Sequence, residues 1–212
     1  MFPQRDALNI LYMAIALLVS LSVHEASHAF IADRLGDNTA RLRGRLTLNP
    51  LAHLDPVGAL VMIVSSIAGI GIGWAKPVPV NPYNLKYGFL ARIPNAPLVG
   101  MAIVALAGPI SNLVLAAITV QGLTLTPLPQ LFLATFLRVN VLLAIFNMIP
   151  IPPLDGYRVL LGLLPTRAGY GLARLEQYGP GLLMLLVFLL PSVLYGILGF
   201  FAPPVLRLIG AM

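Results

Sequence analysis

The sequence of 212 residues contains no cysteine and few charged residues. Without cysteine, the chain can form neither a disulfide nor a metal site with thiolate ligands. Charged side chains make up 9% of the residues, against about 25% in an ordinary soluble domain. Hydrophobic residues make up 58%. Too little polar surface is left to cover a water-soluble globule, so the composition predicts an all-α membrane protein with several transmembrane segments.

Acidic residues are scarcer than basic ones, 7 against 13, which gives a formal charge of +6. A basic chain can bind nucleic acid, but here the positive charge falls in short loops between apolar stretches. Membrane topology and contact with lipid headgroups explain that distribution better. We therefore expect the partners to be the lipid bilayer and membrane proteins, with no binding of nucleic acid.

Four apolar stretches are long enough to cross a bilayer, at about 7–32, 98–123, 129–149 and 180–201. We predict a single membrane-embedded domain over 1–212, with about four to six transmembrane segments. Near residues 40–50, polar and apolar residues alternate, which predicts a short strand or β-hairpin.

The distribution of basic residues predicts the orientation. Four arginines lie within 34–45, directly after the first apolar stretch, and place this loop in the cytoplasm. The loop after the shorter apolar stretch 56–74 is also basic, which conflicts with a single crossing by that stretch. We favour a re-entrant 56–74 segment, in which three glycines help the backbone turn, although an ordinary crossing remains an alternative.

Two histidines and a glutamate interrupt the first apolar stretch in the sequence "SVHEASHAF". Residues four apart share one face of a helix, so His24 and His28 can point at one metal ion. Glu25 lies beside them, which completes an H-E-x-x-H pattern of two imidazole ligands and a general base. Ionisable residues inside a membrane segment are costly and are functional by default, although these three could simply end the helix at the interface.

A catalytic zinc needs a third protein ligand, and the chain has few candidates. Asp155 is the best acidic one, because it follows the proline-rich break in "PIPPLDGYRV". Alternatively, Asp155 caps a helix that starts at Tyr157, and taken alone that explanation is favoured. Beside the H-E-x-x-H pattern we favour a ligand role, and one residue can serve both purposes.

Five segments between residues 24 and 156 resemble one family: "HEASHAF", "NPLAHLDPVG", "GWAKPVPVNP", "AGPISN" and "FNMIPIPPLDG". Together they are similar to the site-2 protease family of intramembrane zinc metalloproteases, peptidase family M50, in the compact form without a PDZ or CBS domain. The resemblance implies one Zn²⁺ per chain, bound by His24, His28 and Asp155, with Glu25 as the base. It also implies a core of three helices (7–32, 98–123 and 129–149) and an active site within the bilayer on the cytoplasmic side.

Three further polar residues are candidates for contact with substrate or oxyanion. The resemblance implies such a role for Asn147, and a hydrogen bond between helices is the alternative. Asn112 in "AGPISN" could act similarly, but a structural role is favoured. His53 could support the site or stabilise an oxyanion, although a polar anchor in its loop is the favoured explanation.

The predicted function is hydrolysis of peptide bonds within or near transmembrane segments of membrane proteins, as in regulated intramembrane proteolysis. The alternatives are a catalytically inactive membrane scaffold and a metal-binding transporter. Transporters usually contain paired repeats, and the sequence has none. An inactive scaffold could lack the base or a ligand, whereas all of them are present. A serine hydrolase would need a Gly-x-Ser-x-Gly nucleophile, which is absent.

Overall fold

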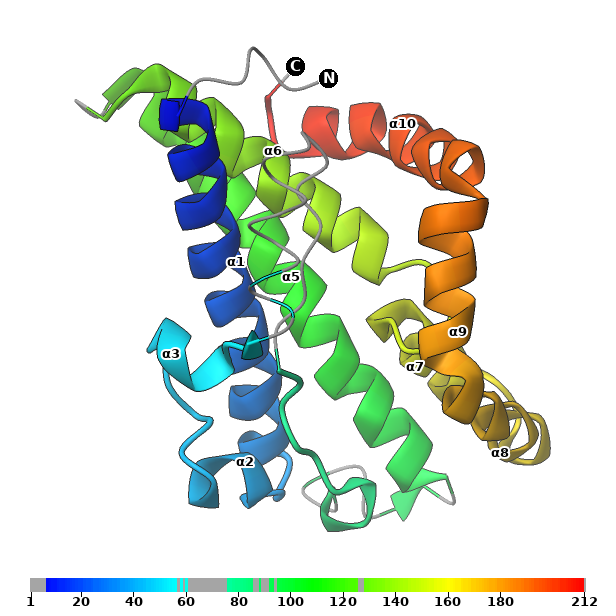
Figure 1. Ribbon diagram of the computed structural model, residues 1–212. Helices are drawn as coiled ribbons and strands as arrows, with labels where there is room; N and C mark the ends of the chain where they lie inside the picture. Colours follow the sequence, from blue (N-terminus) through cyan, green and yellow to red (C-terminus); the bar gives the residue numbers. More distant parts are fainter. Residues whose placement is uncertain are drawn as a thin grey trace.

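The computed structural model describes residues 7–56, 58, 60, 76–85, 88, 92, 93, 95–125 and 128–211. These residues are mainly helical and form no β-sheet (Figure 1). Helical stretches long and apolar enough to cross a membrane occur five times among them: Ala7–Arg34, Ala96–Gly122, Gln130–Asn147, Thr166–Leu189 and Pro191–Leu208. The chain is therefore a multi-pass membrane protein, as its composition predicts.

Helix α1 (Ala7–Arg34) contains neither glycine nor proline over its 28 residues. It ends at Arg34, and Gly36 follows with a φ of 104°, a left-handed conformation that favours glycine. The Asp37 N–H then donates to the Ala32 carbonyl at 2.9 Å, which satisfies a carbonyl at the end of the helix. The chain thus turns sharply just after the last turn of α1.

Helix α5 (Ala96–Leu125) lies at the centre of the bundle and contacts α1, α6 (Gln130–Asn147) and α7 (Asp155–Leu163). It runs antiparallel to α1, so the end of α1 lies beside the start of α5 (Figure 1). The helices approach through small residues that are completely buried, including Ala16, Ala29 and Ala116. Close packing of small residues is the usual source of helix association in membranes, where lipid is as apolar as leucine.

The three predicted core helices are present as α1, α5 and α6, each within three residues of its predicted start. The stretch predicted over 180–201 is divided into two. After α8 (Thr166–Ala173) and a 3₁₀ turn (Arg174–Tyr178), α9 (Gly179–Met184) continues as a π-helical turn (Leu185–Leu189). The chain then bends at Leu190, and Pro191 starts α10 (Pro191–Leu208).

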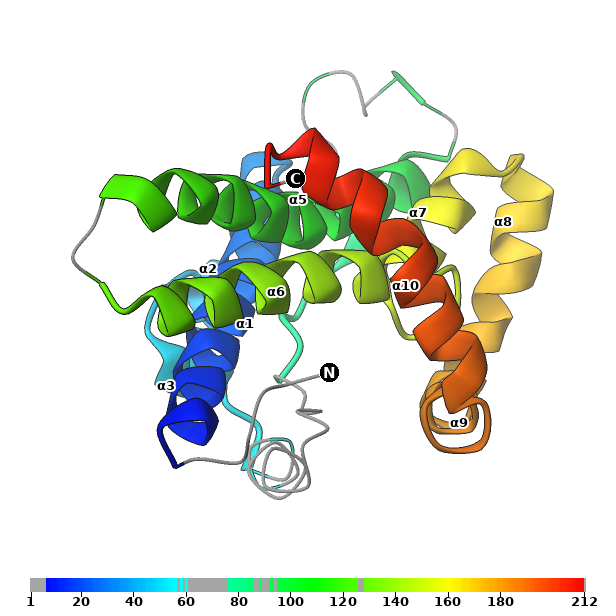
Figure 2. The ribbon, with the colours of Figure 1, turned by 90° about the horizontal axis from the view of Figure 1, so that it is seen from above.

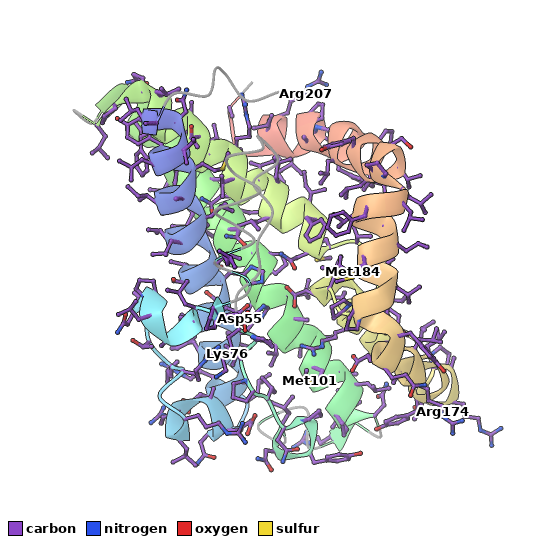
Figure 3. The ribbon with its side chains drawn as sticks, in the orientation of Figure 1. Asp55, Lys76, Met101, Arg174, Met184 and Arg207 are labelled. Carbon is purple, nitrogen blue, oxygen red and sulfur yellow. The ribbon has the colours of Figure 1, made fainter. Side chains whose placement is uncertain are left out.

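The second half of the chain forms a bent arm beside the core. Helix α10 turns away from α9 and passes over α6 when the molecule is seen from above (Figure 2). Arg174 and Arg207 lie at opposite ends of this arm (Figure 3). Large apolar side chains of the arm are exposed, for example Phe188 and Phe200, as expected for a surface that faces lipid.

The β-hairpin predicted near residues 40–50 is wrong. This stretch contains the short helix α2 (Thr39–Leu42), an irregular segment and the start of α3 (Pro50–His53). Local signals outweigh the alternation of polar and apolar residues: Gly44 takes a positive φ of 65°, and the Asn49 side chain caps α3, where Pro50 is the first residue. The re-entrant segment predicted over 56–74 lies outside the described residues, apart from positions 56, 58 and 60.

Candidate metal centre

The two histidines of the H-E-x-x-H pattern lie one turn apart on α1 and are both buried. Their ring centroids are 4.6 Å apart, and both rings face α5. They fit there because Gly108 has no side chain: a Cβ at this position would lie 2.5 Å from the Nε2 atoms of both histidines. Gly108 is therefore required for the position of the histidine pair.

Asp155 reaches the same point from the first turn of α7. Its Oδ2 atom lies 3.1 Å from Nε2 of His24 and 3.3 Å from Nε2 of His28. Gly156 allows this approach, because a Cβ there would lie 2.2 Å from the Met148 carbonyl oxygen. Asp155 does not cap α7: the N-cap position is Leu154, and no side chain caps this helix.

The hydrogen bond of His28 fixes where its proton lies. Nδ1 of His28 lies 2.7 Å from the carbonyl oxygen of Val104 on α5. A carbonyl can only accept, so Nδ1 carries the hydrogen and Nε2 of the neutral ring carries a lone pair. That lone pair faces Asp155.

His24 is fixed in the same way by a chain of two amides. Asn140 donates from Nδ2 to the Phe136 carbonyl at 2.9 Å, so its Oδ1 is an acceptor for Nδ2 of Asn112, also at 2.9 Å. Oδ1 of Asn112 must then accept from Nδ1 of His24, at 2.7 Å. His24 therefore also directs a lone pair of Nε2 at Asp155. Hydrogen bonds of this kind to the second nitrogen are typical of metal-binding histidines.

Two imidazole lone pairs and a carboxylate oxygen thus converge on one point, and they repel one another unless a cation lies between them. Among the described residues no hydrogen-bond donor satisfies Oδ2 of Asp155, although this atom is buried. Ligand atoms of a tetrahedral zinc with bonds of about 2.0–2.1 Å are about 3.3 Å apart, which is close to the 3.1 and 3.3 Å between Oδ2 of Asp155 and the two Nε2 atoms. His24, His28 and Asp155 form a group that could hold a metal ion, and three protein ligands are the number that a catalytic zinc typically has.

Glu25 is half-buried beside the histidines and has a partner that the sequence did not indicate. Its Oε2 atom accepts the backbone N–H of Val78 at 3.0 Å. Val78 belongs to the segment Lys76–Val80, which has neither helix nor strand structure. The segment around "KPVPV" therefore lies against the carboxylate of the predicted base.

The other candidates from the sequence occupy different positions. Asn112 supports His24, as described above. Asn147 donates from Nδ2 to Leu143 within its own helix at 3.0 Å. His53 is buried at the end of α3, with Nε2 donating to the Thr47 carbonyl at 2.8 Å. Asn140 was not predicted, although an amide in the middle of the apolar stretch 129–149 was a signal that could have marked it.

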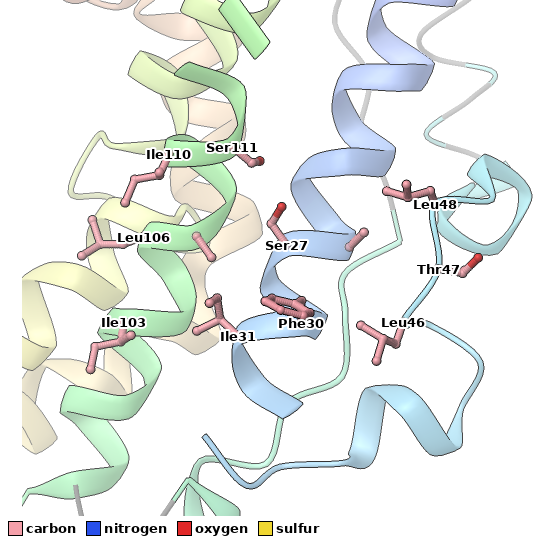
Figure 4. Close-up of a pocket in the computed structure, with 12 residues that line it drawn as sticks. Ser27, Phe30, Ile31, Leu46, Thr47, Leu48, Ile103, Leu106, Ile110 and Ser111 are labelled. Carbon is pink, nitrogen blue, oxygen red and sulfur yellow. The ribbon is translucent and has the colours of Figure 1, made fainter. Parts of the chain in front are cut away.

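An apolar groove of about 610 Å³ lies on the neighbouring faces of α1 and α5 (Figure 4). The segment Leu46–Leu48 borders it on the side of α1. Ser27 and Ser111 also line it, but both hydroxyls donate to carbonyls of their own helices. The groove thus offers apolar surface one helical turn or less from the histidines. Its two serine hydroxyls already form hydrogen bonds within their own helices.

Fold and site together define a class: a multi-pass membrane protein with a buried His–His–Asp metal centre. The family model for peptidase family M50 matches residues 12–131, which include both histidines and Glu25. The chain therefore belongs to peptidase family M50 and is a zinc metalloprotease, as its motifs predict.

Relatives support this assignment. The chain is 38% identical over 193 residues to YwhC of Bacillus subtilis, whose name describes it as a candidate zinc metalloprotease. The match covers 85% of this chain and 81% of YwhC. Rip2 of Mycolicibacterium smegmatis, named in the same way, is 38% identical over 170 residues, or 76% of this chain and 61% of Rip2.

Rip2 of Mycobacterium tuberculosis strain H37Rv is 35% identical over 188 residues, or 84% of this chain and 66% of that protein. The chain thus spans about two thirds or less of the length of these two Rip2 proteins. No solved structure matches the chain significantly.

Proposed function

We propose that this protein is an intramembrane protease that hydrolyses peptide bonds within or near transmembrane segments of other membrane proteins. One observation carries the proposal: two residues of the buried metal centre, His24 and His28, belong to the apolar helix α1 and lie away from either of its ends. A protease for soluble substrates has no need of ligands at this depth, where ionisable residues are costly.

The depth of the site follows from the position of the histidines in α1. His28 and His24 precede Arg34, the last residue of the helix, by about 9 and 15 Å along the axis at 1.5 Å per residue. The hydrocarbon core of a bilayer is about 30 Å thick. A peptide bond that reaches the site has therefore left the membrane surface.

We propose that the end of α1 with the basic residues faces the cytoplasm. Arg34, Arg41 and Arg43 lie at this end and are not buried, which agrees with the positive-inside rule. The start of α5 lies at the same end, so the chain between α1 and α5 leaves and returns on one side (Figure 1). This arrangement supports an active site near the cytoplasmic surface.

The residues divide the chemistry between them. His24, His28 and Asp155 would hold the zinc, which when bound polarises the scissile carbonyl and makes water more acidic. Glu25 takes a proton from the attacking water and passes it to the nitrogen of the leaving amine. Because Oε2 of Glu25 already accepts the Val78 N–H, Oε1 is the atom that takes the proton.

We propose that Asn147 contacts the substrate or its developing oxyanion. It is half-buried at the last turn of α6, shortly before Asp155 in the chain. Among the described residues, its Nδ2 donates to a carbonyl of its own helix, and rotation of the side chain would release this donor.

The test compares wild type with Glu25→Gln on a panel of single-span reporter proteins in liposomes, with zinc content measured for each. Glu176, the other glutamate of the chain, is exposed, and Glu176→Gln is the matched control. We expect wild type and Glu176→Gln to cut a reporter, and Glu25→Gln to retain zinc without cutting. Wild-type protein that holds zinc and cuts none of the reporters would instead favour an inactive scaffold.

A further inference from the structure

The Glu25 carboxylate is held by a backbone segment with few donors. In Lys76–Val80, with the sequence "KPVPV", Pro77 and Pro79 have no N–H. Lys76 donates its N–H to the His53 carbonyl at 2.8 Å. Val78 therefore supplies the only N–H between Lys76 and Val80, and that group donates to Oε2 of Glu25.

Arg45 holds this segment from the other side. Its guanidinium donates to the carbonyls of Ala52 and Lys76, and to that of Pro77 at 3.3 Å. The Pro77 carbonyl and the Val78 N–H belong to one planar peptide unit. Arg45 and Glu25 therefore bind opposite sides of the same peptide, and the position of one side fixes the other.

The local sequence directs Arg45 inward. Gly44 takes a positive φ of 65° at the end of α2, and the Arg45 N–H then donates to the Ala40 carbonyl at 2.8 Å. The turn buries Arg45, which is only 7% exposed as a whole residue, whereas Arg41 and Arg43 before it are exposed.

A buried guanidinium is costly unless its hydrogen bonds compensate for lost water. Arg45 forms no ion pair among the described residues and bonds to backbone carbonyls instead. Lysine or glutamine cannot reproduce this set, because only the planar guanidinium offers several donors in a fixed fork. Arg45 is buried because its guanidinium holds these three backbone carbonyls in one arrangement.

We infer that Arg45 is a positioning residue for catalysis, acting through the Pro77–Val78 peptide on Glu25. The clamped peptide holds Oε2 of Glu25 in place. No described residue forms a hydrogen bond with Oε1, which is therefore the oxygen available for proton transfer. This inference rests on the proposed role of Glu25 as the base. Among the described residues, Arg45 forms no hydrogen bond or ion pair with the metal ligands and does not line the groove. Its contacts with the Lys76 and Pro77 carbonyls are the route by which it can affect the position of Glu25.

The experiment uses the full-length protein in liposomes and a reporter that the wild type cuts. Arg45→Gln should lower kcat by about 10- to 100-fold, because an error of about 1 Å in a catalytic group costs up to about that much. KM should stay within about twofold, and zinc content should not change. Arg45→Lys should restore part of kcat. The exposed Arg43, changed to glutamine, is the matched control and should behave as wild type.

A second pair of variants tests the peptide itself and does not depend on the folding of Arg45→Gln. Val78→Pro removes the N–H that Glu25 accepts, while Val78→Ala shortens the side chain and keeps the N–H. The factor by which kcat is lower in Val78→Pro than in Val78→Ala should match the factor by which Arg45→Gln lowers kcat relative to wild type. The double variant Arg45→Gln/Val78→Pro should be no slower than the slower single variant, because both changes break one interaction.

The inference is overturned if kcat is unchanged in Arg45→Gln, if the two losses multiply in the double variant, or if zinc is lost. A wild type that cuts no reporter, or a Glu25→Gln variant that cuts as well as wild type, contradicts the proposed function instead. The two failures are therefore distinguishable in one set of measurements.

Discussion

Replacement of Asn140 by leucine tests how zinc binding depends on the amide chain behind His24. Leucine has the same number and branching of heavy atoms as asparagine but cannot accept a hydrogen bond. The change removes the acceptor that Nδ2 of Asn112 uses at 2.9 Å and leaves it only the longer contact to the Ser20 carbonyl, at 3.3 Å. With its shorter hydrogen bond lost, the Asn112 amide is less restrained and can rotate to present its NH₂ group to His24.

The size of the effect follows from this rotation. With an NH₂ group facing Nδ1, His24 must carry its proton on Nε2, the atom that should bind the metal. Loss of such a supporting partner typically weakens metal affinity by about 10- to 100-fold. We therefore expect the dissociation constant for zinc to rise by that factor, or about 1.4–2.7 kcal/mol in binding free energy.

The assay is competition for zinc between the purified protein and a chelator of known affinity. Thr119→Val is the matched control: Thr119 is buried on α5, and its hydroxyl donates to Leu115 within the same helix, at 2.7 Å. The reasoning would be refuted if Asn140→Leu bound zinc as tightly as wild type. It would also be refuted if Thr119→Val lost as much affinity, since general loosening of the bundle would then explain both.

Three further predictions follow from single positions. Gly108→Ala should abolish zinc binding, because the new Cβ would lie within 2.5 Å of both histidine rings. The control Gly199→Ala, whose Cβ would meet nothing within 4 Å, should keep one zinc per chain. Equal zinc contents in the two variants would contradict the prediction. Burial alone raises the pKa of Asp37, but hydrogen bonds from neighbouring side chains and backbone outweigh it and lower the pKa. The stability that this carboxylate contributes is therefore present above the unfolded pKa of 3.8 and is lost as the pH falls through the lower folded value. Asp37→Asn should make the melting temperature fall less steeply below about pH 4. If the melting temperature of the variant fell as steeply as that of the wild type, the prediction would be wrong. Asn147→Ala should lower kcat by about 10²-fold with zinc content unchanged. Full activity of this variant would mean that Asn147 does not contact the substrate and serves only its hydrogen bond within α6.

The positions of the long helices could be predicted because hydropathy and length determine a membrane span. The stretches 7–32, 98–123 and 129–149 match α1, α5 and α6 closely. The metal group could be predicted in outline as well, since His24 and His28 are four residues apart and Asp155 follows a proline-rich break. The structure brings these three residues together.

The rest depends on contacts between segments far apart in the chain. Alternation near residues 40–50 indicated a strand, but the cap at Asn49 and the turn at Gly44 favour short helices. No pattern in the sequence shows that Val104 offers a backbone carbonyl to His28, or that Arg45 bonds to the peptide after Pro77. Asn140 alone carried a visible signal, as a polar residue in an apolar helix.

The division of the metal ligands between distant helices has a consequence for biosynthesis. The two histidines enter the membrane with the first helix, whereas Asp155 emerges only after α5 and α6 have been made. Until then, the histidines face each other without their acidic partner, and a nascent chain cannot assemble the centre. The three ligands can surround one metal ion only after α7, which begins with Asp155, has packed beside the histidines of α1.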